Sequence, residues 1–195
     1  MQTQVIRSVD SWLLEVANWH RHEALTWFAR LVMTAGHTVR GVAVLGTIAL
    51  LIVIALRLWR PSIAAVMASF AAGQTADILK DVIGRPRPPA SLAIVPAYGF
   101  SMPSSVAATT SAAAVAFILA IRWKSGRLQM LCSTVAAIAV VGVGVCMVYL
   151  GAHWASDVFA GWVLGSAFGV VAGLVFRERK KDSAPDKPSE RVPSA

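Results

Sequence analysis

Three separated stretches of this chain contain residue types that bind or transfer phosphoryl groups. The first reads KDVIGRPRP, and its Lys80 and Arg87 offer an ammonium and a bidentate guanidinium to phosphate oxygens. The prolines beside Arg87 stiffen this loop, which limits the entropy lost when a ligand binds. Cations in a loop also meet lipid headgroups, so this stretch alone leaves a phosphate site and a headgroup contact open.

The second stretch, GFSMPSSVAATT, is predicted to open a helix at Pro103, Ser104 and Ser105. The free N–H groups and partial positive charge of a helix N-terminus bind anions. Serine is also an ordinary N-cap residue, whose hydroxyl accepts a hydrogen bond from its own helix. Both roles stay open for these serines.

The third stretch, YLGAHWASD, places His153 and Asp157 four residues apart, which puts them on one face at the start of a predicted helix. A carboxylate in that position orients an imidazole and stabilises its cationic form. A lone histidine near a membrane interface is usually structural, but a His–Asp pair facing a cationic loop indicates a functional site.

Together the three stretches resemble the type 2 phosphatidic acid phosphatase family, which is related to the vanadium haloperoxidases. The family signature is Lys, six residues and Arg-Pro; then Pro-Ser-Gly-His; then Ser-Arg, five residues, His, three residues and Asp. The first element is complete in this chain, the second is half present and the third keeps its last two residues. The matching positions are Lys80, Arg87, Pro88, Pro103, Ser104, His153 and Asp157.

The resemblance implies a membrane-bound phosphatase that acts on lipid phosphates or diphosphates, polyprenyl or glycerolipid, without a metal or other cofactor. In the family, the histidine matching His153 attacks phosphorus and forms a phosphohistidine, and the aspartate matching Asp157 holds that histidine. The phosphoryl oxygens are bound at the helix-start amides and by the residues that match, or lie beside, Lys80, Arg87, Ser104 and Ser105.

Two side chains depart from the family pattern. Val106 stands where the family has the histidine that protonates the leaving group, and Met147 stands where it has a phosphate-binding arginine. Losing general-acid help typically slows a reaction by about 10²–10⁴-fold. Losing a buried charged contact weakens binding by roughly a few kcal/mol. The sequence therefore predicts a weakened enzyme and leaves its activity open.

Three hypotheses about function follow. The first is a weak or specialised lipid phosphatase, and we favour it because the His153 and Asp157 pair survives. The second is a catalytically impaired relative that binds lipid phosphates or acts as a partner subunit. The third is a small transporter or channel subunit, which the sequence disfavours because it shows no inverted repeat.

The elements that carry these residues are predicted to be membrane helices. The chain has 195 residues, of which 56% are hydrophobic and 14% charged, which is too apolar for an ordinary soluble domain. The net charge of +8 lies in short clusters between apolar runs rather than in a nucleic-acid-binding pattern. We therefore expect an all-α, multi-pass membrane bundle with lipid partners and no nucleic acid.

Five apolar runs are long enough to suggest membrane spans. They cover about residues 41–58, 61–80, 103–121, 128–150 and 154–176. Charges interrupt the apolar residues before them, so residues 1–38 are predicted to form amphipathic helices at the membrane interface, with a poor sixth span as the alternative. Residues 39–176 then form the phosphatase-like transmembrane domain, and the basic segment 177–195 a disordered tail.

Basic clusters at residues 57–60, 122–127 and 177–181 all fall on one side of the membrane if each run crosses once. By the positive-inside rule, that side and the C-terminus are cytoplasmic in a cell membrane, and the phosphate-binding residues are extracytoplasmic. Lys80, Arg85 and Arg87 lie on the face where that rule disfavours them, which invites a functional explanation.

The last apolar run carries a glycine at every fourth position, which allows another helix to approach closely. These glycines are Gly161, Gly165, Gly169 and Gly173. Tight packing inside one bundle is our preferred interpretation of the strip, and a homodimer seam is the alternative.

Overall fold

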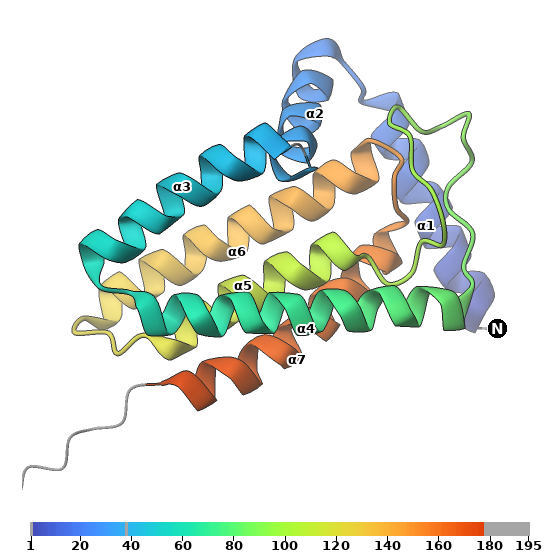
Figure 1. The fold of residues 1–195 in the computed structure, drawn as a ribbon. Helices are drawn as coiled ribbons and strands as arrows, with labels where there is room; N and C mark the ends of the chain where they lie inside the picture. The colour runs from blue at the N-terminus through green and yellow to red at the C-terminus, as the bar shows by residue number, and fades with distance from the viewer. Residues whose placement is uncertain (1, 38, 178–195) are drawn as a thin grey trace, which may run out of the picture.

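The computed structural model describes residues 2–37 and 39–177, and these residues form seven α-helices and no strand. In chain order the helices are α1 (Gln2–Trp19), α2 (Glu23–His37), α3 (Val39–Leu56), α4 (Trp59–Ile83), α5 (Ser105–Ala120), α6 (Gly126–Tyr149) and α7 (Ala155–Phe176). Figure 1 shows α4, α5 and α7 side by side, with α6 and then α3 on one flank. The all-α prediction is confirmed.

The core between α4, α5 and α7 is built from the smallest side chains. Buried alanines recur at every fourth position of α4 and α5, which places each set on one helix face. They are Ala64, Ala68, Ala72, Ala76, Ala108, Ala112, Ala116 and Ala120. Larger apolar side chains, among them Leu164 and Phe168 of α7, pack against this cluster. The helix axes can therefore approach closely, as in other membrane bundles.

The glycine strip of α7 faces α5 within the same chain. A Cβ atom placed on Gly165 would lie 2.0 Å from the carbonyl oxygen of Ala108, and one on Gly161 would lie 2.5 Å from that of Ser104. All four glycines of the strip are buried. The strip thus packs inside one bundle and is not available as a homodimer seam.

The helices differ in their capacity to cross a membrane. In the described part of the chain, α4, α6 and α7 are long enough and apolar enough to cross a membrane. Two shorter apolar helical stretches are Gly46–Leu56 within α3 and the 16 residues of α5, which make about 24 Å of helix. The prediction of a membrane bundle is confirmed, and the count of five spans stays a prediction.

The N-terminal helix α1 packs against the bundle along one face. Leu14 and Asp10, four residues apart, are each only 2% exposed, while Trp12 and Trp19 on other faces are 60% and 86% exposed. In Figure 1, α1 lies at the end of the bundle that also holds the long connection between α4 and α5 and the turn before α7. Three parts of the sequence therefore meet at this end.

Candidate active site

The end of α4 directs the loop that carries Arg85 and Arg87 toward the end of the bundle where α1 lies. Gly84 adopts a left-handed conformation with φ 62°, and its N–H donates to the carbonyl of Lys80 at 2.9 Å, which ends the helix. Ser101 then fixes the loop, because its N–H donates to the carbonyl of Arg85 at 2.9 Å and its hydroxyl lies 3.2 Å from the carbonyls of Arg85 and Pro86. Hydrogen bonds within the loop therefore fix the position of Arg85 and Pro86.

The start of α5 carries the two serines and meets Lys80. Ser104 is the N-cap, and its hydroxyl accepts from the N–H of Ala107 at 3.4 Å. The Lys80 ammonium donates to the Ser105 hydroxyl and to Asp77, each at 2.8 Å. The cap interpretation of Ser104 is therefore confirmed, and the Lys80 charge reinforces the positive end of α5.

His153 lies in the turn before α7 and not on its first turn, which corrects the expected helical placement. Asp157 is the third residue of α7, and its Oδ2 accepts from the Trp154 backbone N–H at 2.9 Å. The same Oδ2 lies 3.6 Å from Nδ1 of His153, which is ion-pair range but longer than a hydrogen bond. His153 is 6% exposed and Asp157 is fully buried. The pair is thus brought together by the turn and the helix start.

Arg87 faces the other nitrogen of the same imidazole. Its Nη1 lies 3.3 Å from Nε2 of His153 and donates to the Ala152 carbonyl at 2.7 Å. Its Nε donates to the carbonyls of Tyr98 and Gly99 at 2.9 and 3.2 Å. A guanidinium has no acceptor, so a hydrogen bond in this contact requires Nε2 to accept and the proton of a neutral imidazole to be on Nδ1, which faces Asp157 without a hydrogen-bond partner among the described residues. Nε2 is therefore the atom with a lone pair facing the cationic loop.

Burial lowers the pKa of the Arg87 guanidinium from its ordinary value, and the negative charge of Asp157 offsets part of that effect. Arginine remains cationic across the physiological range. A partly desolvated, charged guanidinium beside Nε2 is suited to hold an anionic phosphoryl group against the imidazole.

Two charged residues of the site were not assigned from the sequence. Arg85 donates through Nη1 to Oδ1 of Asp157 and through Nη2 to Oδ2 of Asp10, both at 2.6 Å. Its guanidinium carbon also lies 5.6 Å from the centre of the Trp154 ring. Asp10 lies within residues 1–38, which were predicted to form amphipathic helices outside the phosphatase-like domain. Its spacing of four from Leu14 places the two residues on one face of α1, and both are buried there.

The two departures from the family pattern lie in an apolar cluster. Met147 is 1% exposed, and its sulfur accepts from the Ser104 hydroxyl at 3.6 Å. Val106 is partly buried beside the same cluster, which Met147 forms with Ala107 and Val158. The Ser104 hydroxyl is thus engaged by a thioether and by its own helix, instead of being free for an anion.

The structure brings the residues predicted from the sequence into two neighbouring groups. Lys80 and Ser105 form one of them, and a second group of three consists of Arg87, His153 and Asp157. A backbone hydrogen bond of 3.0 Å from the N–H of Ser104 to the carbonyl of Asp157 ties the start of α5 to the start of α7. This bond links the two groups.

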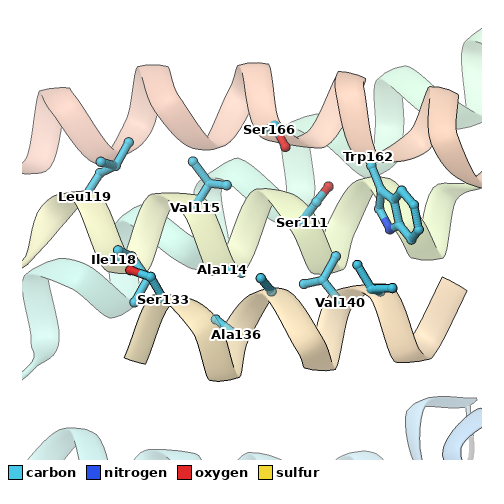
Figure 2. A pocket seen from close by; sticks show the side chains of 12 residues that line it. Ser111, Ala114, Val115, Ile118, Leu119, Ser133, Ala136, Val140, Trp162 and Ser166 are labelled. Atoms are coloured by element: carbon cyan, nitrogen blue, oxygen red, sulfur yellow. The ribbon is translucent and has the colours of Figure 1, made fainter. Parts of the chain in front are cut away.

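Two of the cavities near these elements differ in their lining. One of about 350 Å³ is lined by Arg87 and by residues 88–98 of the loop. The other, a groove of about 390 Å³ between α5, α6 and α7, is lined by apolar side chains with Ser111, Ser133 and Ser166 among them (Figure 2). None of the candidate site residues line this groove, so it suits hydrocarbon rather than phosphate.

Comparison with known proteins identifies the fold and the family. The family model described as the PAP2 superfamily matches residues 59–181, which is more than half of the chain. The chain belongs to the PAP2 superfamily. A solved structure described as the first transmembrane PAP2 type phosphatidylglycerolphosphate phosphatase from Bacillus subtilis is similar, with a TM-score of 0.75 and 19% identity. The similarity covers 92% of this chain and 90% of that one. No curated protein matches.

At 19% identity the structural likeness establishes a shared fold, and membership of the PAP2 superfamily supports a membrane lipid phosphatase. All the residues of the resemblance, from Lys80 to Asp157, lie inside the matched range 59–181. Asp10 lies outside the matched range, so its contact with the site is a feature of the whole fold rather than of the family motif.

Proposed function

We propose that this PAP2 protein hydrolyses lipid phosphates or diphosphates, polyprenyl or glycerolipid, at the extracytoplasmic face through a phosphohistidine on His153. One observation carries the proposal: the imidazole is held between Asp157, facing Nδ1, and Arg87, facing Nε2. This arrangement leaves a lone pair on Nε2 beside a group that binds phosphate.

In the proposed reaction, Nε2 of His153 attacks phosphorus while the bond from phosphorus to the leaving oxygen breaks. The leaving group departs with the electron pair, and Arg87 and Lys80 balance the charge on the phosphoryl oxygens. Asp157 stabilises the positive charge that develops on the ring. Water then attacks phosphorus, the P–N bond breaks, and inorganic phosphate is released with the histidine restored.

Val106 leads to a prediction about the substrate. A departing phosphate has a second pKa of about 6 and needs no donated proton, whereas an alkoxide leaving group does need one. We therefore expect a polyprenyl diphosphate to be cleaved faster than a phosphatidate by purified protein in detergent. Phosphate release measures both rates, and His153→Ala is the control that removes the nucleophile. Equal rates for the two substrates would contradict this assignment of Val106.

A second candidate function is a catalytically impaired relative that binds lipid phosphates. The contact between the Ser104 hydroxyl and the Met147 sulfur favours it, because a serine expected to bind phosphate is engaged elsewhere. The same phosphate-release assay separates the two candidates when it is paired with lipid analysis of the purified protein. Retained lipid phosphate without turnover would support binding alone.

A further inference from the structure

Asp10 of α1 is a buried carboxylate tied into the active site from 75 residues away in the chain. It is 2% exposed. Its Oδ2 accepts from Nη2 of Arg85 at 2.6 Å and from the Ser156 hydroxyl at 2.5 Å, and its Oδ1 accepts from the Ser156 N–H at 2.9 Å. A buried charge needs such partners to offset its desolvation. Both oxygens therefore accept hydrogen bonds from Arg85 or Ser156, which flank the His153 and Asp157 pair.

Arg85 lies between two carboxylates, which fixes the charge of the cluster. It forms ion pairs of 2.6 Å with both Asp10 and Asp157. Two carboxylates and one guanidinium leave one net negative charge. If Arg85 faced Asp157 alone, that pair would be neutral, and less negative potential would reach Nδ1 of His153, which lies 3.6 Å from the Asp157 carboxylate. Asp10 restores that potential by sharing the guanidinium.

The other charges around the imidazole do not replace Asp10. Arg87 favours the same tautomer from the Nε2 side of the ring, but a bound phosphoryl group would neutralise its charge, whereas Asp10 acts from the Nδ1 side. Lys80 is held by Asp77 and Ser105. Arg7 lines a cavity shared with Asp10 and Arg85, but it is exposed, so water and salt screen its charge.

We propose that Asp10 is a positioning residue of this active site: it shares the Arg85 guanidinium, which leaves Asp157 negative enough to keep the proton of His153 on Nδ1. Nε2 then retains its lone pair for the phosphoryl group. The kinetic consequence rests on the proposed function, whereas the effect on the imidazole proton does not. The N-terminal helix thus supplies a part of the site that the family motif lacks.

The test compares three variants with wild type. Asp10→Asn removes the charge with little change in shape. Asp10→Asn combined with Arg85→Gln restores one net negative charge, which lies on Asp157, and that carboxylate keeps its hydrogen bond from the Trp154 N–H. Glu15→Gln, an exposed acid on the same helix, is the matched control. The readouts are the ¹⁵N shifts of histidine-labelled protein in detergent, which report the tautomer of the neutral ring, and kcat and KM for a polyprenyl diphosphate. The His153 signals are assigned by their loss in His153→Asn.

We expect Asp10→Asn to lower the fraction of the Nδ1–H tautomer and to reduce kcat on the order of tenfold or more, with KM nearly unchanged, because the wrong tautomer offers no lone pair to phosphorus. The double variant should regain the wild-type tautomer, and Glu15→Gln should match wild type. A folded Asp10→Asn protein with the wild-type tautomer, or the same change in Glu15→Gln, would overturn the inference.

If Asp10→Asn does not fold, the double variant decides: a wild-type tautomer supports the charge argument, and a shifted one refutes it. If the wild-type protein hydrolyses no lipid phosphate while the tautomer shifts as expected, the proposed function fails and the role of Asp10 stands. The two failures are therefore distinguishable.

Discussion

At the scale of single residues, the two departures from the PAP2 pattern are coupled to each other. Met147 is buried where the motif has an arginine, and the Ser104 hydroxyl donates to its sulfur. Val106 packs beside the same apolar cluster, where the motif has a histidine. The two residues that depart from the motif therefore share one apolar cluster next to Ser104, while the imidazole of His153 lies between Arg87 and Asp157.

This coupling predicts that the site can be repaired in two steps. Val106→His should raise hydrolysis of a short-chain phosphatidate by about 10²-fold or more, because it supplies a proton donor. Adding Met147→Arg should raise it further and tighten substrate binding, because the guanidinium can replace the thioether beside Ser104. Phosphate release by wild type, both single variants and the double variant measures the effect, which should be non-additive because both groups act on one phosphoryl group.

His153→Ala in the repaired protein is the control, and it should abolish turnover because it removes the nucleophile. All variants are first checked for folding in detergent, since an arginine at the buried position of Met147 needs the phosphate or Ser104 as a partner. A folded double variant no faster than wild type would favour the lipid-binding function over the catalytic one.

The sequence predicts the residues that contact the imidazole, but not Arg85, which pairs with Asp157, or Asp10, which pairs with Arg85. His153, Asp157 and Arg87 were found from their types and spacing, and the structure places them together. From the sequence, Arg85 stands out only as a cation on the face where the positive-inside rule disfavours it, and Asp10 does not stand out from the other charges of residues 1–38. Their pairing joins segments 75 residues apart, and no local pattern reports how two such segments pack.

At the scale of elements, α5 and α7 can approach because their facing residues are alanine and glycine. The Gly165 site is the tightest point, since an added Cβ would also lie 2.2 Å from the Ser111 hydroxyl. This contact holds the starts of both helices, and therefore Ser104 and Asp157, in register. The packing of the core and the geometry of the site are linked through these two helices.

We expect Gly165→Ala to lower the melting temperature of the protein in detergent, because the methyl group forces the α5 and α7 backbones apart. Overpacking of this kind typically costs about 1–3 kcal/mol. Gly142→Ala is the matched control, because a Cβ at this exposed position of α6 meets nothing within 4 Å. A melting temperature unchanged by Gly165→Ala, or lowered equally by both changes, would contradict the packing argument.

The sequence predicted the helices better than their relation to the membrane. The apolar runs at 128–150 and 154–176 match α6 and α7 within a few residues. The run at 103–121 contains α5, a 16-residue helix between α4 and α7, and its span stays a prediction. An alanine-rich core helix and a membrane span have similar compositions, so apolarity alone does not separate them.

At the scale of the whole molecule, the two ends of the bundle carry positive charge for different reasons. At one end, Arg85 and Arg87 are engaged with carboxylates, an imidazole and backbone carbonyls. The opposite end in Figure 1 carries the α3–α4 turn, the α5–α6 connection and the end of α7, which hold the clusters at 57–60 and 122–127 and Arg177. The positive-inside rule applies to the charges at this second end, because they take no part in the candidate site.

This asymmetry predicts that the active-site end faces outward and the C-terminal tail faces the cytoplasm. In a protein with Cys132→Ala and Cys146→Ala, which removes both native cysteines, Ser91→Cys should react with a membrane-impermeant maleimide on intact cells. Ser183→Cys should react only after permeabilisation, because the basic segment beside it stays on the side of synthesis. Permeabilised cells provide the control that both thiols are reactive. Labelling of Ser183→Cys but not Ser91→Cys on intact cells would invert the topology, and the substrate would then have to be a lipid phosphate of the inner leaflet.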